Sequence, residues 1–493
     1  MDVSYISTRG NSEPLSFAGA VTEGMVSSGG LFVPKEIPRV DFSKLAGRSY
    51  QEVAAAALTP FMGGFDDGEI HTCVNGAYTP ESFDIPEVVK TVPIGCNRYI
   101  LELWHGPTAA FKDVALQIMP RFMRFSKVKC NDNSRTLILV ATSGDTGKAA
   151  LEGFKNRDGI SIAVFYPHGG VSEIQRLQMA TTDGNNTTVI AARGNFDDCQ
   201  SGVKALFGDS ALRDRAANRG VKFSSANSIN WGRLCPQIVY YVKSYLDLVS
   251  TKAISYGDNV DFCVPTGNFG NILAGYYARE MGLPIRRLVC ASNKNNVLTD
   301  FFKSGEYSVK DREFHKTMSP SMDILVSSNL ERFLFEMSGR DAGKIIDWYE
   351  SLAKEGRFSV DTDMTGKMRE LVEARWVGEG EVLKTIGDVY RESRYVTDTH
   401  TAVAVSCING INRNDGVPVI ITSTASPFKF APDVLKGLGI NANGDEFESI
   451  KTLSSLGAGS IHRAVDGLTE KKVLHDRVID IGEMREIVEQ LLR

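Results

Sequence analysis

Arg135-Thr-Leu-Ile-Leu-Val-Ala-Thr-Ser-Gly-Asp-Thr-Gly147 passes from an apolar run into a glycine-rich turn. Because the run is continuous and rich in β-favouring residues, it predicts a strand that is buried on both faces. An Ala-rich helical pattern follows the turn and continues to Phe154. A buried strand, a tight turn and a helix in direct succession are typical of a parallel sheet with crossover helices.

The same alternation of short apolar strands and amphipathic helices continues along the chain. Further strands are predicted at residues 160–166, 187–192, 262–265, 287–291 and 418–423, and a helix at residues 172–180. Strands recur on both sides of about residue 255. We therefore predict an α/β protein with two open, twisted, mostly parallel sheets that are flanked by helices.

Several domains are expected, because a chain of 493 residues is too long for one hydrophobic core. Residues 1–98 are predicted as a mixed N-terminal extension, with a short extended piece after Gly29-Gly30 and a helix from Tyr50 to Ala57. Residues 99–255 and 256–493 are predicted as two α/β domains with a cleft between them. Residues 305–380 are predicted as a mostly helical insertion in the second of these domains.

The composition is that of an ordinary soluble enzyme, with 42% hydrophobic and 23% charged residues. The formal net charge of -5 argues against a nucleic-acid surface, and no apolar stretch is long enough to span a bilayer. The first nine residues resemble neither a signal peptide nor a transit peptide. The eight scattered cysteines contain no C-x-x-C pair, so we expect no metal site, no disulfide framework and a reducing cytoplasm.

Two glycine turns stand where a strand is predicted to become a helix, a place where open α/β sheets bind ligands. The second glycine turn, residues 265–271 (Pro-Thr-Gly-Asn-Phe-Gly-Asn), carries no acidic charge. Gly267, Asn268, Gly270 and Asn271 tolerate a positive φ or a close approach, so this turn is predicted to hold a phosphate at a helix N-terminus. The alternative is a turn that binds nothing.

The first glycine turn, residues 141–147 (Ala-Thr-Ser-Gly-Asp-Thr-Gly), offers hydroxyl groups beside main-chain donors. Asp145 would repel a bare phosphate, so the turn suits the carboxylate of an amino-acid substrate or the edge of a cofactor ring. The following Lys148 does not make a P-loop, because the required spacing is absent and Ala149 replaces the hydroxyl that binds magnesium. The alternative is ordinary helix capping by Asp145 and Thr146.

Lys112 lies in an apolar stretch, His105-Gly-Pro-Thr-Ala-Ala-Phe-Lys-Asp113. A lysine in a partly desolvated site has a lowered pKa, so its neutral amine can condense with a carbonyl. A lysine next to Asp113 is by itself more often a solvated surface charge. The two glycine turns in the same chain favour the functional interpretation.

These residues together resemble the threonine synthase family of fold-type II (tryptophan synthase β-like) pyridoxal phosphate enzymes. The resemblance covers most of the chain and keeps the family's order of motifs. It rests on residues 5–10 (Tyr-Ile-Ser-Thr-Arg-Gly), 29–34 (Gly-Gly-Leu-Phe-Val-Pro), 105–113, 141–147, 227–231 (Asn-Ser-Ile-Asn-Trp), 265–271, 398–402 (Asp-Thr-His-Thr-Ala) and 423–430 (Ser-Thr-Ala-Ser-Pro-Phe-Lys-Phe). Any one motif is moderately specific, but together and in order they make a strong resemblance.

The resemblance implies a pyridoxal phosphate enzyme that converts O-phosphohomoserine and water into threonine and phosphate. Lys112 would hold the cofactor as a Schiff base and move protons, and Thr424 would hydrogen-bond the pyridine nitrogen. The cofactor phosphate would be bound by Gly267, Asn268, Phe269, Gly270 and Asn271. Ser143, Asp145 and Thr146 would face the substrate carboxylate or the ring hydroxyl, and Thr108 would also contact substrate.

The phosphate of the substrate needs a site of its own. Ser228, Asn230 and Arg233 are candidates, because the planar fork of an arginine makes two parallel bonds to a phosphate. The alternative is a helix start in which Asn230 is the cap and Arg233 lies on the surface.

Two departures from the family leave the product open. Ser426 stands where the family often has histidine, and Thr399 stands where proline is usual. An O-phosphohomoserine phospho-lyase that stops at elimination and yields 2-oxobutyrate, or a β-replacement enzyme, would use nearly the same site. A third possibility is a catalytically silent ligand-binding protein. The expected partner is a small-molecule substrate, and the chain could be a monomer or a homodimer.

Overall fold

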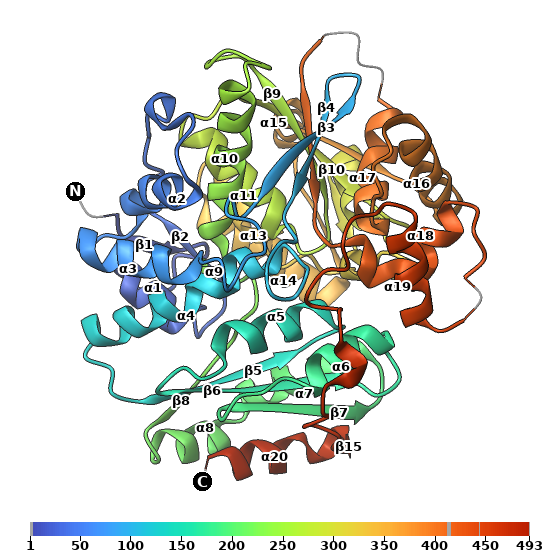
Figure 1. Cartoon of the computed structure of the whole chain (residues 1–493). Helices are drawn as coiled ribbons and strands as arrows, with labels where there is room; N and C mark the ends of the chain where they lie inside the picture. The colour runs from blue at the N-terminus through green and yellow to red at the C-terminus, as the bar shows by residue number, and fades with distance from the viewer. Residues whose placement is uncertain (1–2, 412–415, 443, 493) are drawn as a thin grey trace.

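Both predicted sheets are present, one above the other in the view of Figure 1. The structure is a computed structural model, and it describes residues 3–411, 416–442 and 444–492. Within these residues the larger sheet has six strands and the smaller has five, and helices cover them. The predicted α/β fold class is therefore confirmed.

The larger sheet has the strand order β13-β10-β9-β14-β4-β3. Its strands are β3 (Lys90–Gly95), β4 (Arg98–Glu102), β9 (Val260–Pro265), β10 (Ile285–Ser292), β13 (Val372–Trp376) and β14 (Val419–Ser423). All neighbours run parallel except β3, which pairs antiparallel with β4. Every residue of β9 and β14 is buried, as expected for strands covered on both faces. The strands predicted in this half of the chain are β9, β10 and β14.

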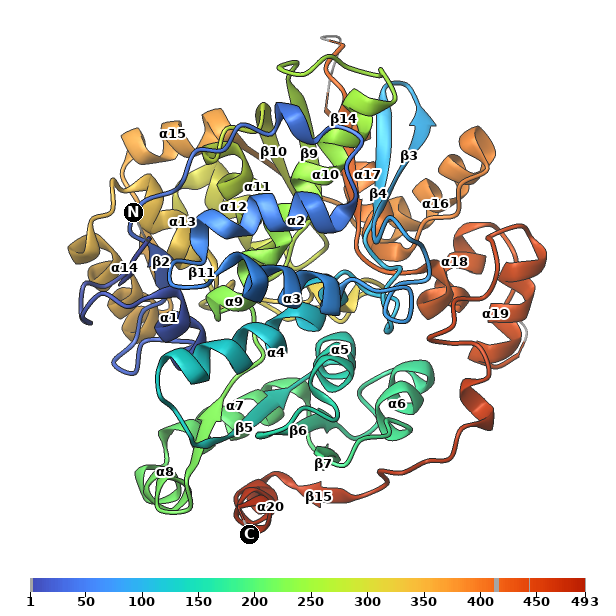
Figure 2. The ribbon, with the colours of Figure 1, turned by 60° about the vertical axis from the view of Figure 1, so that its left-hand side comes forward.

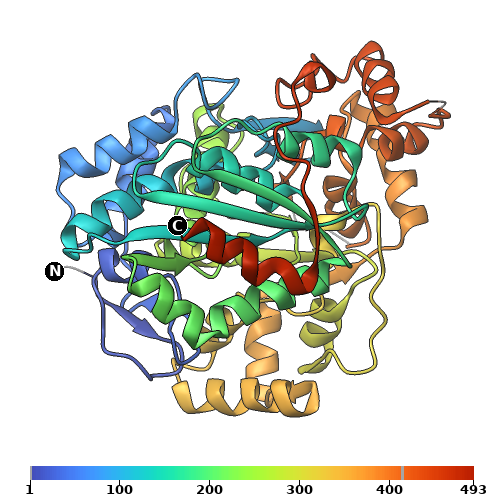
Figure 3. The same ribbon diagram turned by 90° about the horizontal axis from the view of Figure 1, so that it is seen from below.

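The smaller sheet has the order β15-β7-β6-β5-β8, and all of its strands are parallel. Its strands are β5 (Arg135–Ala141), β6 (Ile160–Pro167), β7 (Thr187–Arg193), β8 (Val221–Ser224) and β15 (Val478–Asp480). The last helix, α20 (Met484–Leu491), lies across the outer face of this sheet (Figure 3). The predicted strands β5, β6 and β7 are confirmed, and so is the helix α6 (Glu173–Ala180).

The N-terminal region packs against two long central helices (Figure 2). It contains β1 (Tyr5–Ser7), β2 (Phe32–Pro34), α1 (Phe17–Glu23), α2 (Tyr50–Leu58) and α3 (Asp67–Ala77). The central helices are α4 (Lys112–Lys129), which contacts α1 and α3, and α10 (Pro236–Ser250), which contacts α2. The predicted helix from residue 50 is confirmed, and a reciprocal hydrogen-bonded cap between Ser49 and Glu52 begins it.

Strand pairing crosses the predicted domain boundaries. The hairpin of β3 and β4 spans residue 98, and β4 pairs with β14 from the far end of the chain. Likewise β15 joins the sheet of β5 to β8. The boundaries at residues 98 and 255 therefore do not divide the sheets, and they stay a proposal about folding units. The sequence did not reveal these pairings, because pairing between distant segments leaves no local pattern.

The segment at residues 305–380, which the sequence predicts as a mostly helical insertion, combines helices with short strands and loops. It contains α13 (Leu330–Met337), α14 (Ala342–Glu355) and α15 (Thr362–Leu371), with the short hairpin strands β11 (Glu306–Ser308) and β12 (Arg357–Ser359). Its end supplies β13, the edge strand of the larger sheet. In the described part of the chain, no helix combines the length and the apolar character that crossing a bilayer requires.

Candidate active site

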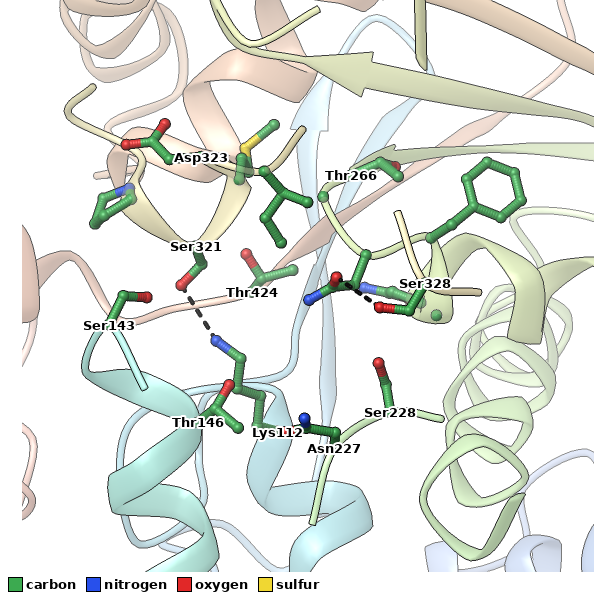
Figure 4. Close-up of a pocket in the computed structure, with 18 of the residues that line it drawn as sticks. Lys112, Ser143, Thr146, Asn227, Ser228, Thr266, Ser321, Asp323, Ser328 and Thr424 are labelled. Atoms are coloured by element: carbon green, nitrogen blue, oxygen red, sulfur yellow. Dashed lines mark hydrogen bonds between the residues drawn. The ribbon is translucent and has the colours of Figure 1, made fainter. Parts of the chain in front are cut away.

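One cavity gathers most of the residues that the sequence singles out (Figure 4). It lies beyond the carboxyl ends of β5, β9 and β14, where ligands bind in open α/β sheets. The predicted site residues that line it are Lys112, Ser143, Thr146, Ser228, Arg233, Gly267, Asn268, Phe269, Gly270, Asn271 and Thr424. Both glycine turns, the lysine and the proposed arginine thus face the same space.

Lys112 begins α4, and the loop before it is tied to the segment that follows β14. Phe111 N donates to the carbonyl of Thr424 at 2.9 Å, and Ala110 forms an antiparallel bridge with Ala425. These bonds place Lys112 and Thr424 side by side, and Figure 4 shows both side chains in the cavity. The proximity arises from pairing between residues more than three hundred positions apart.

The amine of Lys112 is buried among polar groups, so the interpretation as a solvated surface charge is wrong. The residue is 9% exposed, its Nζ donates to Oγ of Ser321 at 3.2 Å, and it lies 3.7 Å from Oδ2 of Asp145. Burial lowers the pKa of Lys112 to about 8; the charge of Asp145 opposes this shift, whereas those of Lys429 and Arg233 add to it. Part of the population is therefore a neutral amine near pH 7, as a nucleophile that attacks a carbonyl requires.

The first glycine turn is organised by a threonine hydroxyl. Oγ1 of Thr142 accepts from Gly144 N at 3.0 Å and from Gly147 N at 2.8 Å. Gly144, with φ of 131°, precedes the helix α5 (Asp145–Phe154), whose first-turn amides have no partner within the helix. Ser143 and Thr146 lie at this end of α5 in the cavity wall (Figure 4), where a substrate carboxylate would meet free amides and hydroxyls.

Asp145 does not cap the helix, so the capping alternative is wrong for this residue. Its carboxylate lies beside the cavity wall and accepts bonds from Lys429 and from Gln175 at 3.0 Å. Burial alone would raise the pKa of Asp145, but the charges of Lys429 and Lys112 hold it well below its usual range. It is therefore a permanent anion between two lysines.

The second glycine turn begins α11 (Gly270–Glu280) with a left-handed residue. Phe269 has φ of 63°, and a Cβ atom at Gly267 would lie 2.9 Å from the carbonyl oxygen of Ser321. The amide of Asn271 is oriented by two tyrosines, since its Oδ1 accepts from the hydroxyl groups of Tyr240 at 2.6 Å and Tyr241 at 2.8 Å. Its buried Nδ2 has no acceptor among the described residues. A turn that leaves a buried donor at a helix N-terminus fits a phosphate group.

Arg233 is buried, so the alternative that places it on the surface is wrong. It is 5% exposed, donates to the carbonyl of Ala226, and lines the cavity. Burial lowers the pKa of Arg233 to about 10. Within the described residues no carboxylate forms an ion pair with it, which leaves a desolvated cation for an anionic ligand.

Thr108 and Asn230 do not line the cavity, because both are occupied in structural roles. The amide and hydroxyl of Thr108 donate to the Asp113 carboxylate at 2.8 and 2.7 Å, and burial raises the pKa of Asp113 to about 6. Asn230 caps the short helix α9 (Trp231–Leu234), accepting from Gly232 N at 2.8 Å. The capping alternative is therefore correct for Asn230.

Sequence reasoning gave no role to three residues of the site. Ser321 bridges Lys112 and Asp145, and its amide donates to Nε2 of His400 at 3.3 Å. Nδ1 of His400 is 2.8 Å from Asp398, and His400 lines the cavity. Lys429 is completely buried against Asp145. His400 and Lys429 stand in two of the quoted motifs, but Ser321 lies in a segment without a regular pattern.

The two departures from the family pattern lie outside the cavity lining. Ser426 is completely buried, and its Oγ accepts from Phe428 N at 3.4 Å at the start of the 3-10 turn η4 (Pro427–Phe430). The hydroxyl of Thr399 donates to the carbonyl of Met318 at 2.7 Å. Thr399 therefore holds the segment that carries Ser321, and Ser426 shapes the turn that carries Lys429.

Two known protein families match different parts of this chain. A family described as "Pyridoxal-phosphate dependent enzyme" matches residues 90–423, which contain both glycine turns and Lys112. A second, described as "Threonine synthase N terminus", matches residues 4–78. The threonine synthase of Pseudomonas aeruginosa is 40% identical over 440 residues, covering 88% of this chain and 90% of that protein. The chain belongs to the threonine synthase family of pyridoxal-phosphate dependent enzymes.

Two further proteins are similar to this chain over nearly all of its length. The crystal structure of pyridoxal-phosphate-bound threonine synthase from Brucella melitensis has a TM-score of 0.87 and 35% identity, covering 100% of both chains. Human "Threonine synthase-like 1" is 40% identical over 495 residues, covering 97% of this chain. The chain spans 66% of that human protein's length.

The cofactor of the family is pyridoxal phosphate, and the residues present fit it. Among the described residues Nδ2 of Asn271 has no acceptor, so it can donate to a phosphate oxygen, and the buried amine of Lys112 can condense with an aldehyde. The hydroxyl of Thr424 lies next to Lys112, where it can bond a ring nitrogen.

Proposed function

We propose that this protein is a threonine synthase, which converts O-phospho-L-homoserine and water into L-threonine and phosphate. The observation that carries the proposal is Arg233, a buried arginine in the same cavity as the second glycine turn, which pairs with no carboxylate among the residues that the structure describes. A cavity lined by both an arginine and a glycine turn at a helix N-terminus suits a phosphorylated substrate beside a phosphorylated cofactor.

In this proposal Lys112 carries the cofactor, the second glycine turn holds its phosphate, and Thr424 bonds its ring nitrogen. Bound pyridoxal phosphate supplies an electron sink that acidifies the hydrogens next to the substrate's amino-bearing carbon. A hydroxyl partner such as Thr424 leaves the ring nitrogen largely unprotonated, and an unprotonated ring withdraws electrons less strongly.

The substrate is proposed to lie with its carboxylate at the first glycine turn and its phosphate at Arg233. The amides at the start of α5 that Thr142 does not accept from, together with the hydroxyls of Ser143 and Thr146, would bind the carboxylate. Ser228 also lines the cavity and would share the phosphate. Held at both ends, the substrate has its reacting carbons next to the amine of Lys112, which would remove and return protons.

The amine of Lys112 has a partner that can keep it in place between transfers. Its Nζ is bonded to Oγ of Ser321, which in turn donates to Asp145 at 3.1 Å. A base that serves several steps needs such an anchor, because misplacement by one ångström is costly.

The second candidate, a phospho-lyase that yields 2-oxobutyrate, rested on Ser426 in the sequence. Because Ser426 does not line the cavity, its difference from the family pattern gives little support to a lyase. The relative named "Threonine synthase-like 1" carries no reaction in its name, so product analysis has to decide. The scattered cysteines of the sequence still predict a reducing cytoplasm.

The test is turnover of O-phosphohomoserine with threonine, 2-oxobutyrate and phosphate all quantified. Threonine as the main product supports the synthase, and 2-oxobutyrate without threonine overturns it in favour of the lyase. Lys112→Ala should abolish both products and the absorbance of bound cofactor. Full activity of this variant would remove Lys112 from the proposal.

Arg233→Ala tests the phosphate site. Because charge-assisted hydrogen bonds contribute about 1.5–3 kcal/mol each, kcat/KM should fall about 10- to 100-fold or more. The exposed Arg213 on α8 (Ser210–Ala217) provides the matched control, and Arg213→Ala should leave kcat/KM unchanged. Equal kinetics in both variants would contradict the assignment of Arg233.

A further inference from the structure

Two lysines share the carboxylate of Asp145, and only one of them faces the cavity. Nζ of Lys429 donates to Oδ1 of Asp145 at 2.5 Å, whereas Nζ of Lys112 is 3.7 Å from Oδ2. The side chain of Lys429 is completely buried, and that of Asp145 is 4% exposed. The closer, better oriented ion pair is therefore the one that does not involve Lys112.

Lys429 joins three segments of the site. It lies on η4, bonds Asp145 at the start of α5, and also donates to the carbonyl of Thr108 at 3.2 Å in the loop before Lys112. Lys429 is not among the residues that line the cavity, so it acts on bound ligands only through other residues.

The charge balance around Lys112 depends on this sharing. An unshared carboxylate would stabilise Lys112 as an ammonium ion, which has no lone pair for attack on a carbonyl. A second lysine neutralises that carboxylate and adds a like charge nearby, which disfavours the ammonium form. The other charged groups here are Arg233 from α9, Asp323 in the cavity wall and Asp113, whose carboxylate faces Thr108. The titratable His400 from α17 (Thr399–Asn409) accepts from the Ser321 amide at Nε2 and is bonded to Asp398 through Nδ1.

We propose that Lys429 is a positioning residue that occupies the Asp145 carboxylate, so that Lys112 remains a reactive free amine at neutral pH. The proposal rests on the attachment of the cofactor to Lys112. In that step the amine nitrogen bonds to the aldehyde carbon, and the aldehyde oxygen leaves as water with two hydrogens from the amine. Only the unprotonated amine can begin it.

The experiment measures cofactor capture rather than turnover. Cofactor is removed from the purified full chain, pyridoxal phosphate is added back, and the growth of imine absorbance is followed between pH 6 and pH 10. In wild type the rate should rise through a midpoint near the pKa of Lys112, about 8. Lys429→Met should move that midpoint up by about one pH unit or more, so that capture at pH 7 is about tenfold slower.

Two further variants separate electrostatics from packing. Asp145→Asn removes the anion, so the midpoint should fall below that of wild type, and the double variant should lie between the two single variants. Lys148→Met is the matched control, because Lys148 is also buried on α5 but pairs with Glu152 and does not line the cavity. It should leave the midpoint unchanged.

Each outcome supports or overturns the proposal. Slower capture by Lys429→Met at every pH with an unmoved midpoint would reduce Lys429 to a structural role. If that variant does not fold, Asp145→Asn decides alone, and a midpoint that does not fall overturns the proposal. If Lys112→Ala captured the cofactor normally, Lys112 would not be the attachment site. None of these measurements depends on which amino acid is the substrate.

Discussion

The two glycine turns occupy equivalent places at the ends of β5 and β9, yet they present different chemistry. The first turn combines hydroxyl groups with Asp145, an anion already shared by two lysines. The second turn carries no charge, but it has a left-handed Phe269 and the unpartnered donor of Asn271. The same strand-turn-helix geometry is therefore specialised by its side chains.

The difference corresponds to two kinds of ligand. A turn without an acidic group, fixed by two buried tyrosines, suits a phosphate that stays bound through every turnover. A turn with hydroxyls and a balanced carboxylate suits a substrate that binds and leaves. If this comparison is correct, changes in the second turn should weaken cofactor binding. Changes to the hydroxyl groups and glycines of the first turn should affect the substrate, whereas Asp145 acts on Lys112.

The largest effect is expected from Asn271→Asp. The variant keeps an oxygen for the hydroxyls of Tyr240 and Tyr241 but replaces the free donor by a carboxylate that repels phosphate. The dissociation constant of pyridoxal phosphate should rise about 100-fold, while KM measured at saturating cofactor changes little. Equilibrium titration of the resolved enzyme measures the first quantity, and steady-state kinetics measure the second.

A second residue of the same turn, three positions earlier, also lines the cavity and tests how much of the effect comes from the buried donor. Asn268 is exposed and bonded to Ser328, so Asn268→Asp makes the same charge change at a solvated position. Its effect on cofactor affinity should be clearly smaller, because water screens an exposed charge. Equal losses in the two variants would show that only the net charge of the turn matters.

A smaller effect is expected from Gly147→Ala in the first turn. An added Cβ would lie 2.4 Å from Cγ2 of Thr142, the residue whose hydroxyl accepts from Gly144 and Gly147. Overpacking of this kind costs about 1–3 kcal/mol, so kcat/KM should fall about tenfold with cofactor affinity retained. Loss of cofactor affinity in this variant would break the division between the turns.

Much of this architecture could be predicted from the sequence, because it rests on local patterns. The strands β5, β9 and β14 each contain a short apolar run, and each is followed by a turn or hydroxyl that lines the cavity. Lys112 was predicted to be the cofactor lysine from a short motif and the resemblance it carries, and the structure places it in the cavity.

The contacts that were not predicted all join distant segments. Lys429 reaches Asp145 across 284 positions, and Ser321 reaches Lys112 across 209. No periodicity marks such partners, because each lies on a different element. Conversely, Thr108 and Asn230 were expected to bind substrate from their place in motifs, but each hydrogen-bonds within its own loop or helix start. These two polar residues serve the scaffold of the site and do not line its cavity.

The smallest effect is expected from Ser143→Ala, which removes one hydroxyl from the first turn. The backbone amides of α5 stay in place, so the substrate carboxylate would lose one hydrogen bond of several. Because the remaining amides and the hydroxyl of Thr146 still bind that carboxylate, the loss should be about 1 kcal/mol, so KM should rise about three- to tenfold while cofactor affinity and kcat remain close to wild type. A change in kcat of similar size would instead place Ser143 in the chemical step. That result would sharpen the comparison, because the first turn would then act on the reaction as well as on substrate binding.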